Sequence, residues 1–400
     1  MEKLEIKNFG GMRNVTIDIN KINIFIGEQA TGKSLIAKVL FFCKSFFDYY
    51  KTAIMQHRSI EEFENKLIEI FESFFNVASL EANFEINYTL DSSLKLKIFR
   101  KDKKTNINYG GWKKKYNIYI SGINSGPGNR NRNCDDVLKD IPVKKQIFIP
   151  AGRANIAIFQ NQMWKIVKNG VKLDPFLIDW GDFYQEEIKE KIVFNENLFI
   201  ENNNNITEVI KGAHKRRDGI EYLEQGERDV PLNHLSSGQQ EAISILELSL
   251  LRYSENAHND VAYIEEPEAH LHPSAQKRVT EIIAQVFNEF NGNMQIVITT
   301  HSPYILTSFN NLICAGTVKE KIGNDKQKNK DLKKIIGDEK NIINCKDVFA
   351  FNMLYKKNGY TVEKIMDKET GLINAEKIDK ISDELAKTFD KLLELEDGGI

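Results

Sequence analysis

The first forty residues alternate between short apolar stretches and turns. Residues 4–9 (LEIKNF) and 15–19 (VTIDI) alternate polar and apolar positions, which is typical of half-buried strands, and a Gly-Gly turn lies between them. Residues 22–26 (INIFI) are almost continuously apolar, which indicates a strand buried on both faces. A glycine-bounded loop follows, and helical spacing begins at residue 35. The predicted order is therefore strand, loop and helix.

The middle of the chain continues this mixture of strands and helices. Residues 83–99 predict two strands around an Asp-Ser-Ser turn, and residues 116–123 (YNIYISGI) predict a third strand. The composition of residues 121–134 predicts a flexible surface loop. Residues 144–150 (KKQIFIP) predict a second buried strand that runs into a loop, and a helical pattern extends from about 155 to 195.

The last third of the chain has the clearest pattern. A strand with an acidic end is predicted at 260–268 (DVAYIEEPE) and a buried strand at 294–300 (MQIVITT). Between them, residues 273–290 predict a helix with proline in its first turn. Residues 319–334 are densely charged and predict a mobile linker, and residues 377–395 predict a final helix.

The composition of the 400 residues narrows the class of protein. Hydrophobic residues make up 41% and charged residues 28%, which is ordinary for globular proteins, and the length predicts one large domain with insertions or two domains. Lys and Arg number 55 against 57 Asp and Glu, so the net charge of -2 neither indicates nor excludes a nucleic-acid partner. No apolar run approaches ~18 residues, and the first eleven residues (MEKLEIKNFGG) do not predict a signal region. Scattered cysteines without a CxxC pair indicate reduced thiols and a cytoplasmic protein: Cys43, Cys134, Cys314 and Cys345.

The loop after the strand at 22–26 matches the pattern GxxxxGK[ST]. Its glycines allow the backbone to wrap around a phosphate chain with N–H groups pointing inward. Lys33 supplies a positive charge for the β- and γ-phosphates, and the Ser34 hydroxyl is a ligand for Mg²⁺. A strand before the motif and a helix after it are the context that a phosphate loop requires. The predicted nucleotide-binding residues are Gly27, Glu28, Gln29, Ala30, Thr31, Gly32, Lys33 and Ser34.

A pair of acidic residues ends the predicted strand at 260–268. The carboxyl ends of parallel strands face the ligand in sheets of this kind, so Glu265 and Glu266 are expected beside the phosphates. The segment resembles a Walker B motif. Glu265 stands where aspartate is usual and is expected to hold Mg²⁺, while Glu266 is expected to polarise the attacking water.

The same segment allows a competing interpretation. In YIEEPEAHLHP, His270 and His272 follow the glutamates closely, and such residues could hold zinc or a pair of metal ions in a hydrolase. Two histidines in an exposed loop, without a ligand, are the plainer alternative. Pro267 suggests that the strand has ended before them, and the phosphate loop favours an ATPase.

Two further motifs accompany the phosphate loop. Residues 235–240 (LSSGQQ) resemble the LSGGQ signature of ABC-type ATPases, and serine and glycine at a helix start suit an anion. His301 follows the predicted strand at 294–300, where the switch histidine of ABC-type ATPases lies, and this resemblance implies that His301 senses the γ-phosphate and orients water. A satisfied structural histidine and an ordinary helix cap are the plainer alternatives. The signature residues predicted to bind nucleotide are Ser236, Ser237, Gly238 and Gln239.

Together, the four motifs occur in the order found in the ABC-type heads of the chromosome-maintenance, break-repair and overcoming-lysogenisation-defect ATPases. The resemblance covers residues 1 to about 310. IEEPEAHLHP and IFIPAGR look most like the stand-alone ATPases of bacterial anti-phage defence systems such as Septu and PARIS. The resemblance implies an α/β P-loop head with an antiparallel β subdomain and an inserted β and helical region at about 45–234.

The resemblance also implies roles for individual residues and partners. ATP and Mg²⁺ are the implied cofactors, and a head-to-tail homodimer or higher oligomer would place each signature on the partner's γ-phosphate. By analogy alone, Arg153 is expected at the γ-phosphate or at the dimer interface. Gln146 and Gln160 are weak candidates for a glutamine loop.

Residues 311–400 are expected to form an α+β extension that binds a partner protein. They contain neither a DxD pair nor a histidine, so a nuclease of the type appended to overcoming-lysogenisation-defect proteins is not expected there. The leading interpretation is an ATP-hydrolysing switch that controls a separate effector protein, with no membrane contact.

Two other functions stay open. A DNA-repair or chromosome-associated clamp head is less consistent with the lack of sustained heptads between residues 45 and 235, and a transporter ATPase is less consistent with IEEPEAHLHP. Basic runs leave contact with nucleic acid open: residues 100–104, 113–115 and 214–217.

Overall fold

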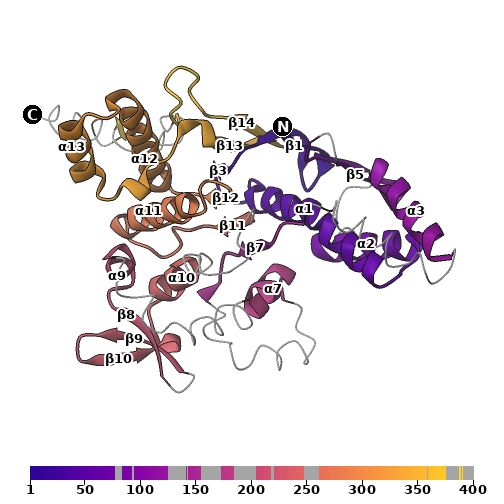
Figure 1. Ribbon diagram of the computed structural model, residues 1–400, viewed down its shortest axis with the longest axis horizontal. Coiled ribbons are helices and arrows are strands. Elements are labelled where there is room, and N and C mark those ends of the chain that lie inside the picture. The colour runs from indigo at the N-terminus through magenta and orange to yellow at the C-terminus, as the bar shows by residue number, and fades with distance from the viewer. Residues whose placement is uncertain are drawn as a thin grey trace, which may run out of the picture.

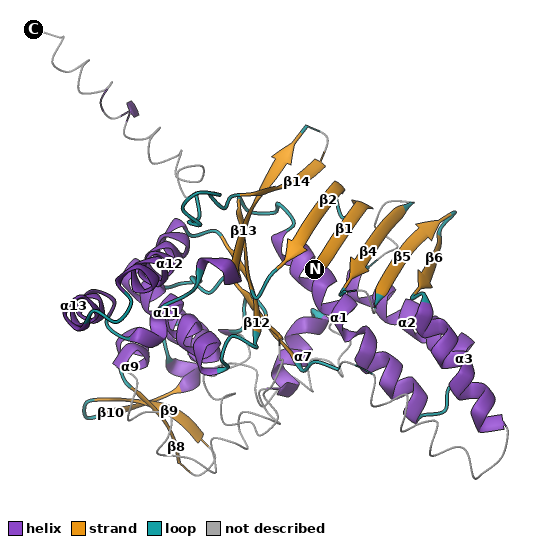
Figure 2. Ribbon diagram, turned by 45° about the horizontal axis from the view of Figure 1, so that its top comes forward, coloured by secondary structure: helices purple, strands orange, loops and turns teal. Residues whose placement is uncertain are grey.

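The computed structural model shows a mixed α/β molecule (Figures 1 and 2). Every helix among the described residues is too short or too polar to span a bilayer. The predicted helices at 155–195 and 377–395 lie mostly outside the described residues, as does most of the surface loop predicted at 121–134. The residues described are 1–76, 83–91, 94–124, 141, 143–154, 173–183, 204–217, 220–246, 261–357, 359–374, 387, 388 and 390.

One large sheet organises the molecule. It has eleven strands in the order β6-β5-β4-β1-β2-β14-β13-β3-β12-β11-β7. Five neighbouring strands are parallel: β7 (Gln146–Ile149), β11 (Val261–Glu265), β12 (Gln295–Thr300), β3 (Ile22–Gly27) and β13 (Val348–Lys356). Because parallel strands end at the same edge, the residues that follow β3, β11 and β12 are brought together.

The other side of the sheet is mainly antiparallel and joins the parallel part through β14. Its strands alternate buried and outward-facing residues, as predicted for the amino-terminal segments and for the hairpin at 83–99. Together the two parts confirm the predicted α/β fold with an antiparallel subdomain. The strands are β1 (Glu2–Phe9), β2 (Met12–Ile19), β4 (Phe84–Thr89), β5 (Lys95–Lys101), β6 (Lys104–Asn108) and β14 (Gly359–Lys364).

Helices cover both faces of the sheet, so each parallel strand sends alternate side chains to two cores. Ile24 and Ile264 belong to the core shared with α11, whereas Phe25 and Tyr263 belong to the core shared with α1. The helices are α1 (Lys33–Met55), α2 (Ile60–Phe75), α3 (Gly111–Asn124), α7 (Pro175–Phe183), α9 (Asn204–Ile210), α10 (Ser237–Leu246), α11 (Pro273–Glu289), α12 (Pro303–Ile322) and α13 (Lys326–Ile336).

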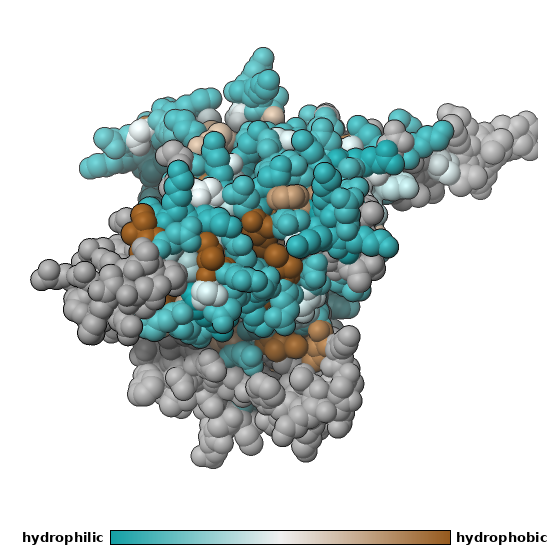
Figure 3. Space-filling model, turned by 90° about the vertical axis from the view of Figure 1, so that its right-hand side faces the viewer, coloured by the Kyte–Doolittle hydropathy of each residue, from teal (hydrophilic) through white to brown (hydrophobic). Residues whose placement is uncertain are grey.

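A small second sheet, antiparallel and in the order β10-β9-β8, lies near α9 and α10 (Figure 1). It consists of β8 (Ala213–Arg217), β9 (Ile220–Gln225) and β10 (Arg228–Pro231). On the opposite side, the face formed by α2 and α3 is largely hydrophilic outside the grey atoms, with small hydrophobic spots (Figure 3). That face therefore has the character of an ordinary water-facing surface.

Two local predictions are wrong. The strand predicted at 116–123 lies in helix α3, where Tyr116 is fully buried and its hydroxyl donates to the carbonyl of Arg58 at 2.8 Å. Tertiary packing overrides the strand preference of the YNIYISGI segment. The charged stretch at 319–334 forms the end of α12 and most of α13, joined around Gly323, rather than a linker.

The sheet also extends beyond the predicted boundary near residue 310. Strand β13 lies directly beside β3 in parallel register, with Val348 opposite Ile22 and Met353 opposite Gly27. Strand β14 then pairs with β13 and touches β2 through Tyr360 and Met12. The carboxyl-terminal segment therefore supplies the strand that connects the parallel part of the sheet to the antiparallel part.

Candidate nucleotide-binding site

The phosphate loop joins the end of β3 to the start of α1. Its backbone takes left-handed or glycine-specific angles, with φ of 154° at Gly27, 59° at Ala30 and 89° at Gly32. A side chain at Gly27 would place a Cβ atom only 2.4 Å from the Met353 carbonyl oxygen. The first glycine of the motif is thus required both by the turn and by the close approach of β13.

Lys33 is buried and folds back over this loop. Its Nζ donates to the carbonyl oxygens of Gly27 at 2.9 Å and Glu28 at 2.7 Å. The Thr31 hydroxyl donates to the same Glu28 carbonyl at 2.8 Å. Burial lowers the pKa of Lys33 to about 8, although nearby carboxylates oppose the change. At neutral pH Lys33 therefore still carries its charge, but it loses its proton more readily than an exposed lysine does.

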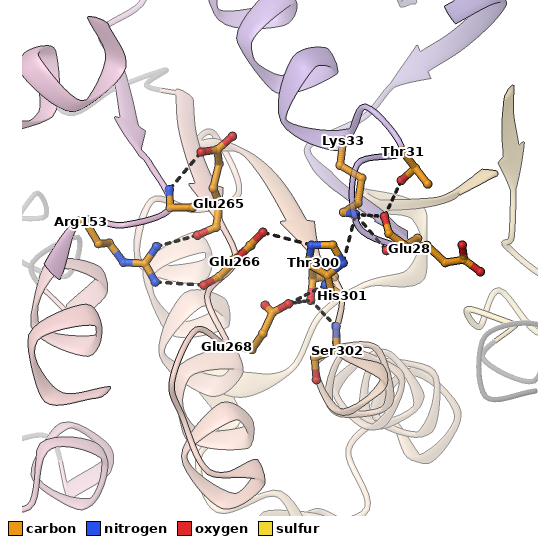
Figure 4. A network of polar contacts seen from close by, with 12 residues as sticks. Glu28, Thr31, Lys33, Arg153, Glu265, Glu266, Glu268, Thr300, His301 and Ser302 are labelled. Carbon is orange, nitrogen blue, oxygen red and sulfur yellow. Dashed lines mark hydrogen bonds and ion pairs between the residues drawn. The ribbon is translucent and has the colours of Figure 1, made fainter. Parts of the chain in front are cut away.

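A chain of polar contacts runs from Lys33 to Glu266 (Figure 4). Lys33 Nζ lies 3.2 Å from Nδ1 of His301, and Nε2 of the same ring lies 3.1 Å from Oε1 of Glu266. The hydrogen bond from His301 and the nearby charge of Lys33 keep the pKa of Glu266 below its usual value, although partial burial opposes them. Glu266 is therefore a carboxylate at neutral pH, as a water-polarising base must be.

Glu266 occupies a constrained place just after β11. Its backbone has a φ of 44°, in the left-handed region that non-glycine residues rarely adopt. Its N–H donates to the carbonyl of Thr299 at 2.8 Å, and its carbonyl accepts from the N–H of Ala269 at 3.0 Å. The left-handed residue ends β11 and aims the half-exposed carboxylate at the ring of His301.

Glu265 points away from Glu266 and is buried. Its Oε2 accepts from the N–H of Ala151 at 3.0 Å, whereas Oε1 has no hydrogen-bond partner among the described residues. A buried, unsatisfied carboxylate oxygen at the carboxyl end of β11 suits a hard divalent cation. The residues present therefore fit Mg²⁺, with Ser34 at the start of α1 as the second candidate ligand.

Glu268 is a residue of this site for which the sequence motifs predicted no role. Its Oε1 accepts from the Thr300 hydroxyl at 2.7 Å and from the N–H of His301 at 2.6 Å. Thr300 in turn accepts from the N–H of Ser302 at 3.0 Å. Glu268 thus fixes the backbone from which the ring of His301 extends. The sequence feature that could have indicated this role is that Glu268 is a third glutamate, two positions after Glu266, in the turn that follows β11.

The structure gives Arg153 a different place from the one predicted. Its guanidinium group is 1% exposed and donates to the carbonyl oxygens of Pro150, Glu241, Glu265 and Glu266 at 2.6–3.1 Å. It also forms an ion pair with the Glu241 carboxylate at 3.0 Å. These contacts use the guanidinium group to hold the end of β11 against α10, rather than to present it to a phosphate.

The signature residues lie at the start of α10. Ser236 is exposed and caps the helix: its Oγ donates to Oε1 of Gln239 at 2.9 Å and accepts from the N–H of Gln239 at 3.4 Å. Gln239 also donates to the carbonyl of Ile210 at 2.7 Å. A Cβ atom at Gly238 would lie 2.6 Å from the carbonyl oxygen of His270. The glycine thus allows α10 to approach the turn after Glu266, while Ser236 and Ser237 face solvent.

Gln146, a candidate for the glutamine loop, is the first residue of β7. It therefore lies at the amino-terminal ends of the parallel strands, whereas the phosphate loop lies at their carboxyl ends. Its amide donates to the Phe41 carbonyl at 3.3 Å and to the Ser45 hydroxyl at 2.7 Å, and accepts from the Tyr263 hydroxyl at 2.9 Å. Its contacts are therefore structural. Gln160 lies outside the described residues.

The two histidines of the metal interpretation are exposed. His272 caps α11, with Nδ1 accepting from the N–H of Ser274 at 3.3 Å. His270 has a φ of 56° in the turn before it. Across the described part of the chain, no group of three or more His, Cys, Asp or Glu side chains has the spacing of a metal site.

Comparison with known proteins identifies a family. A model of the AAA ATPase domain matches residues 1–126 and 143–306, which is more than half of the chain. None of the curated proteins compared matches it.

Solved structures of low similarity include SMC heads. One is an SMC head bound to the C-winged helix domain of ScpA, 11% identical, with 90% of this chain and 96% of that chain covered and a TM-score of 0.43. The SMC head domain from Thermotoga maritima is 11% identical, with 91% and 98% covered and a TM-score of 0.41. An SMC head bound to the C-terminal domain of ScpA from Pyrococcus furiosus is 11% identical, with 96% and 100% covered and a TM-score of 0.43.

These TM-scores lie below 0.5, so neither the function nor the assembly of this chain follows from them. The family match covers the phosphate loop, the two glutamates at the end of β11, the signature and His301. The phosphate loop, Glu266 and His301 converge at one edge of the sheet. The chain therefore belongs to the AAA ATPase domain family, as a P-loop nucleoside-triphosphate-binding protein.

Proposed function

We propose that this chain binds and hydrolyses ATP and that Glu266 is its general base. The observation that carries the proposal is the hydrogen-bonded chain from Lys33 through His301 to Glu266. Lys33 and the Glu266 carboxylate lie on two sides of the His301 ring, close to the carboxyl ends of neighbouring parallel strands. ATP hydrolysis requires a cation at the γ-phosphate and a base close to the attacking water, and Lys33 and Glu266 suit these two roles.

Each residue of the site has a distinct role in this proposal. The glycine-rich loop and Lys33 hold the phosphates. Glu266 accepts the proton of the attacking water, and His301 orients Glu266 and senses the γ-phosphate. Mg²⁺, when bound by Ser34 and Glu265, supplies charge neutralisation at the phosphate oxygens. Glu268 and Arg153 act through other residues, by fixing the backbones that carry His301 and Glu266.

We further propose that two copies of the chain close on ATP in a head-to-tail dimer. Ser236 and Ser237 are exposed at the start of α10, where the amino-terminal end of a helix favours an anion. The hydrogen bonds of Ser236 are made to Gln239 on its own helix. Its hydroxyl is thus held at a surface where a partner's γ-phosphate could reach it.

The dimer would serve as a switch for a separate effector protein, in an anti-phage defence system. The resemblance of IEEPEAHLHP and IFIPAGR to the ATPases of such systems supports this role. The segment after residue 310 is proposed to bind the partner through α13 and the end of α12, whose residues are mostly exposed, because β13 and β14 belong to the sheet. A gene for a nuclease or toxin next to this one would support the role.

Phosphate release from ATP by the purified chain tests the enzymatic proposal. Wild-type protein should release phosphate in Mg²⁺ and lose this activity in EDTA. Glu266→Gln should abolish most of it, and His272→Ala, at an exposed histidine of the same segment, should not. Equal activity of wild-type protein and Glu266→Gln would overturn the assignment of the base.

A DNA-repair or chromosome-associated clamp is a second candidate function. Exposed lysines at the tip of the β5–β6 hairpin favour it, because they can neutralise nucleic-acid phosphates: Lys101, Lys103 and Lys104. Stimulation of ATP turnover by DNA, lost when these three are changed to Glu, would favour the clamp over the effector switch.

A further inference from the structure

The β13–β14 hairpin lies beside the phosphate loop on the side away from Glu266. In the sheet, β12 and β11 lie on one side of β3 and carry His301 and Glu266, and β13 lies on the other side. Met353 of β13 is paired with Gly27, so residues 354–356 extend past the point where β3 becomes the loop. If the γ-phosphate faces Glu266, the remainder of a bound nucleotide leaves the loop toward this hairpin.

Tyr360 fixes the hairpin to the turn after β1 and lies close to the phosphate loop. The N–H of Tyr360 donates to the Gly11 carbonyl at 2.9 Å. A Cβ atom at Gly11 would lie 2.6 Å from the Tyr360 ring, and one at Gly32 would lie 3.9 Å from it. The half-buried Tyr360 ring is therefore wedged between the turn after β1 and the residue that precedes Lys33.

Tyr355 lies opposite Tyr360 across the hairpin, with the ring centroids 5.4 Å apart. Whereas Tyr360 is packed, the Tyr355 side chain is 68% exposed. It also lines a cavity of about 260 Å³ whose walls include Gly27, Glu28 and His301. An aromatic ring held in place by a second ring, and open to a cavity beside the phosphate loop, has the form of a stacking platform.

We infer that Tyr355 is the stacking platform for the base of the nucleoside triphosphate, with Tyr360 as its support. The inference rests on the proposed ATP binding and adds a subsite that lies beyond residue 306, where the family match ends. Stacking on an aromatic ring tolerates different bases, since every base has a π face. The subsite therefore contributes affinity for a nucleotide over bare polyphosphate.

Calorimetric titration with ATP and with inorganic tripolyphosphate separates the contribution of the base to the binding affinity from that of the phosphates. Tyr355→Ala should weaken ATP binding roughly 5- to 150-fold, the range of one lost base–aromatic stack, and leave tripolyphosphate affinity unchanged. Tyr355→Trp should retain ATP affinity. Ile335→Ala removes a comparably exposed apolar side chain from α13 and should change neither affinity.

The outcomes distinguish the subsite from the phosphate site. If Tyr355→Ala binds ATP as tightly as wild-type protein, or loses ATP and tripolyphosphate affinity equally, the base subsite is wrong. Lys33→Ala should lose affinity for both ligands. If that variant binds both normally, the proposed phosphate site fails, whatever Tyr355 does.

Discussion

Nζ of Lys33 and Nδ1 of His301 lie 3.2 Å apart, and this contact fixes the tautomer of the histidine. An ammonium group has only donors, so Nδ1 accepts and the ring proton resides on Nε2. Nε2 then donates to Glu266 at 3.1 Å. Lys33 and the proposed base are thus connected through one imidazole ring, which would sense whether Lys33 has turned toward a phosphate.

The lowered pKa of Lys33 predicts a pH dependence of ATP affinity. Below a pH of about 8 the ammonium is charged, and above it the amine becomes neutral in the nucleotide-free protein. Phosphates bind the charged form, so ATP affinity should be level below pH 8 and fall by up to about tenfold per pH unit above it. Calorimetry at about pH 7 and about pH 9.5 measures the difference.

Lys33→Arg is the control, because its guanidinium does not titrate in this range. Its ATP affinity should be weaker and nearly independent of pH. A wild-type affinity that stays constant to about pH 9.5 would contradict the pKa assignment.

Glu266→Gln should bind ATP and hydrolyse it slowly. The amide keeps the size of the side chain but cannot accept the proton of water, and general-base losses are on the order of 10²–10⁴-fold. Phosphate release in a single turnover, compared with ATP affinity, gives the two quantities. If the variant instead loses zinc while ATP turnover persists, the metal-hydrolase alternative is correct.

Glu268 should act as a positioning residue. Glu268→Ala removes the acceptor for Thr300 and for the backbone of His301, so the ring of His301 loses its fixed place. Turnover should fall about 10- to 100-fold, as expected from a misplacement near 1 Å, with ATP affinity nearly unchanged. Glu268→Gln keeps one acceptor oxygen and should recover part of kcat. Equal losses of melting temperature and of ATP affinity in both variants would indicate a structural role alone.

The site could be predicted from the sequence as far as its signals were local. The phosphate loop, Glu266 and His301 each follow an apolar strand, so pattern and motif together located them. Arg153 could not be placed in this way, because it contacts the carbonyl oxygens of Glu265 and Glu266, which are 112 and 113 positions further along the chain.

The same limit applies to the fold. Nothing in the spacing of residues 348–364 shows that β13 will pair with β3, more than 300 residues earlier. That pairing depends on the whole sheet having formed, and it places Met353 and Tyr355 beside the loop. The sequence therefore predicted the residues proposed for catalysis, and the structure was required to find the side proposed for the base.

Arg153→Ala should primarily destabilise the protein. The change leaves four carbonyl groups and the Glu241 carboxylate without their buried cation. Loss of one partner from a buried ion pair costs about 3–5 kcal/mol in the free energy of unfolding, which urea denaturation measures. If stability is unchanged and ATP affinity falls, Arg153 contacts the γ-phosphate as the resemblance implied.

The position of Ser236 predicts how two chains share ATP sites. Ser236→Arg should leave ATP binding by the monomer nearly intact and block ATP-dependent closure of the dimer, because a bulky cation replaces an exposed hydroxyl. Ser236→Ala is the control, since it removes the cap at a cost of about 1 kcal/mol without adding bulk. Gly238 is a poorer probe, because any side chain there would strike the His270 carbonyl of its own chain.

Mixing Ser236→Arg with Lys33→Ala gives the decisive test. Each variant alone should be nearly inactive. In a head-to-tail dimer of the two, both lesions fall in one composite site, and the other site keeps an intact Lys33 and an intact signature. Part of the wild-type turnover should therefore return on mixing. An absence of recovery at every ratio, with mixed dimers confirmed by mass, would count against independent shared sites, although strict coupling of the two sites would give the same result. Recovery would be hard to reconcile with a signature that serves its own chain's phosphate.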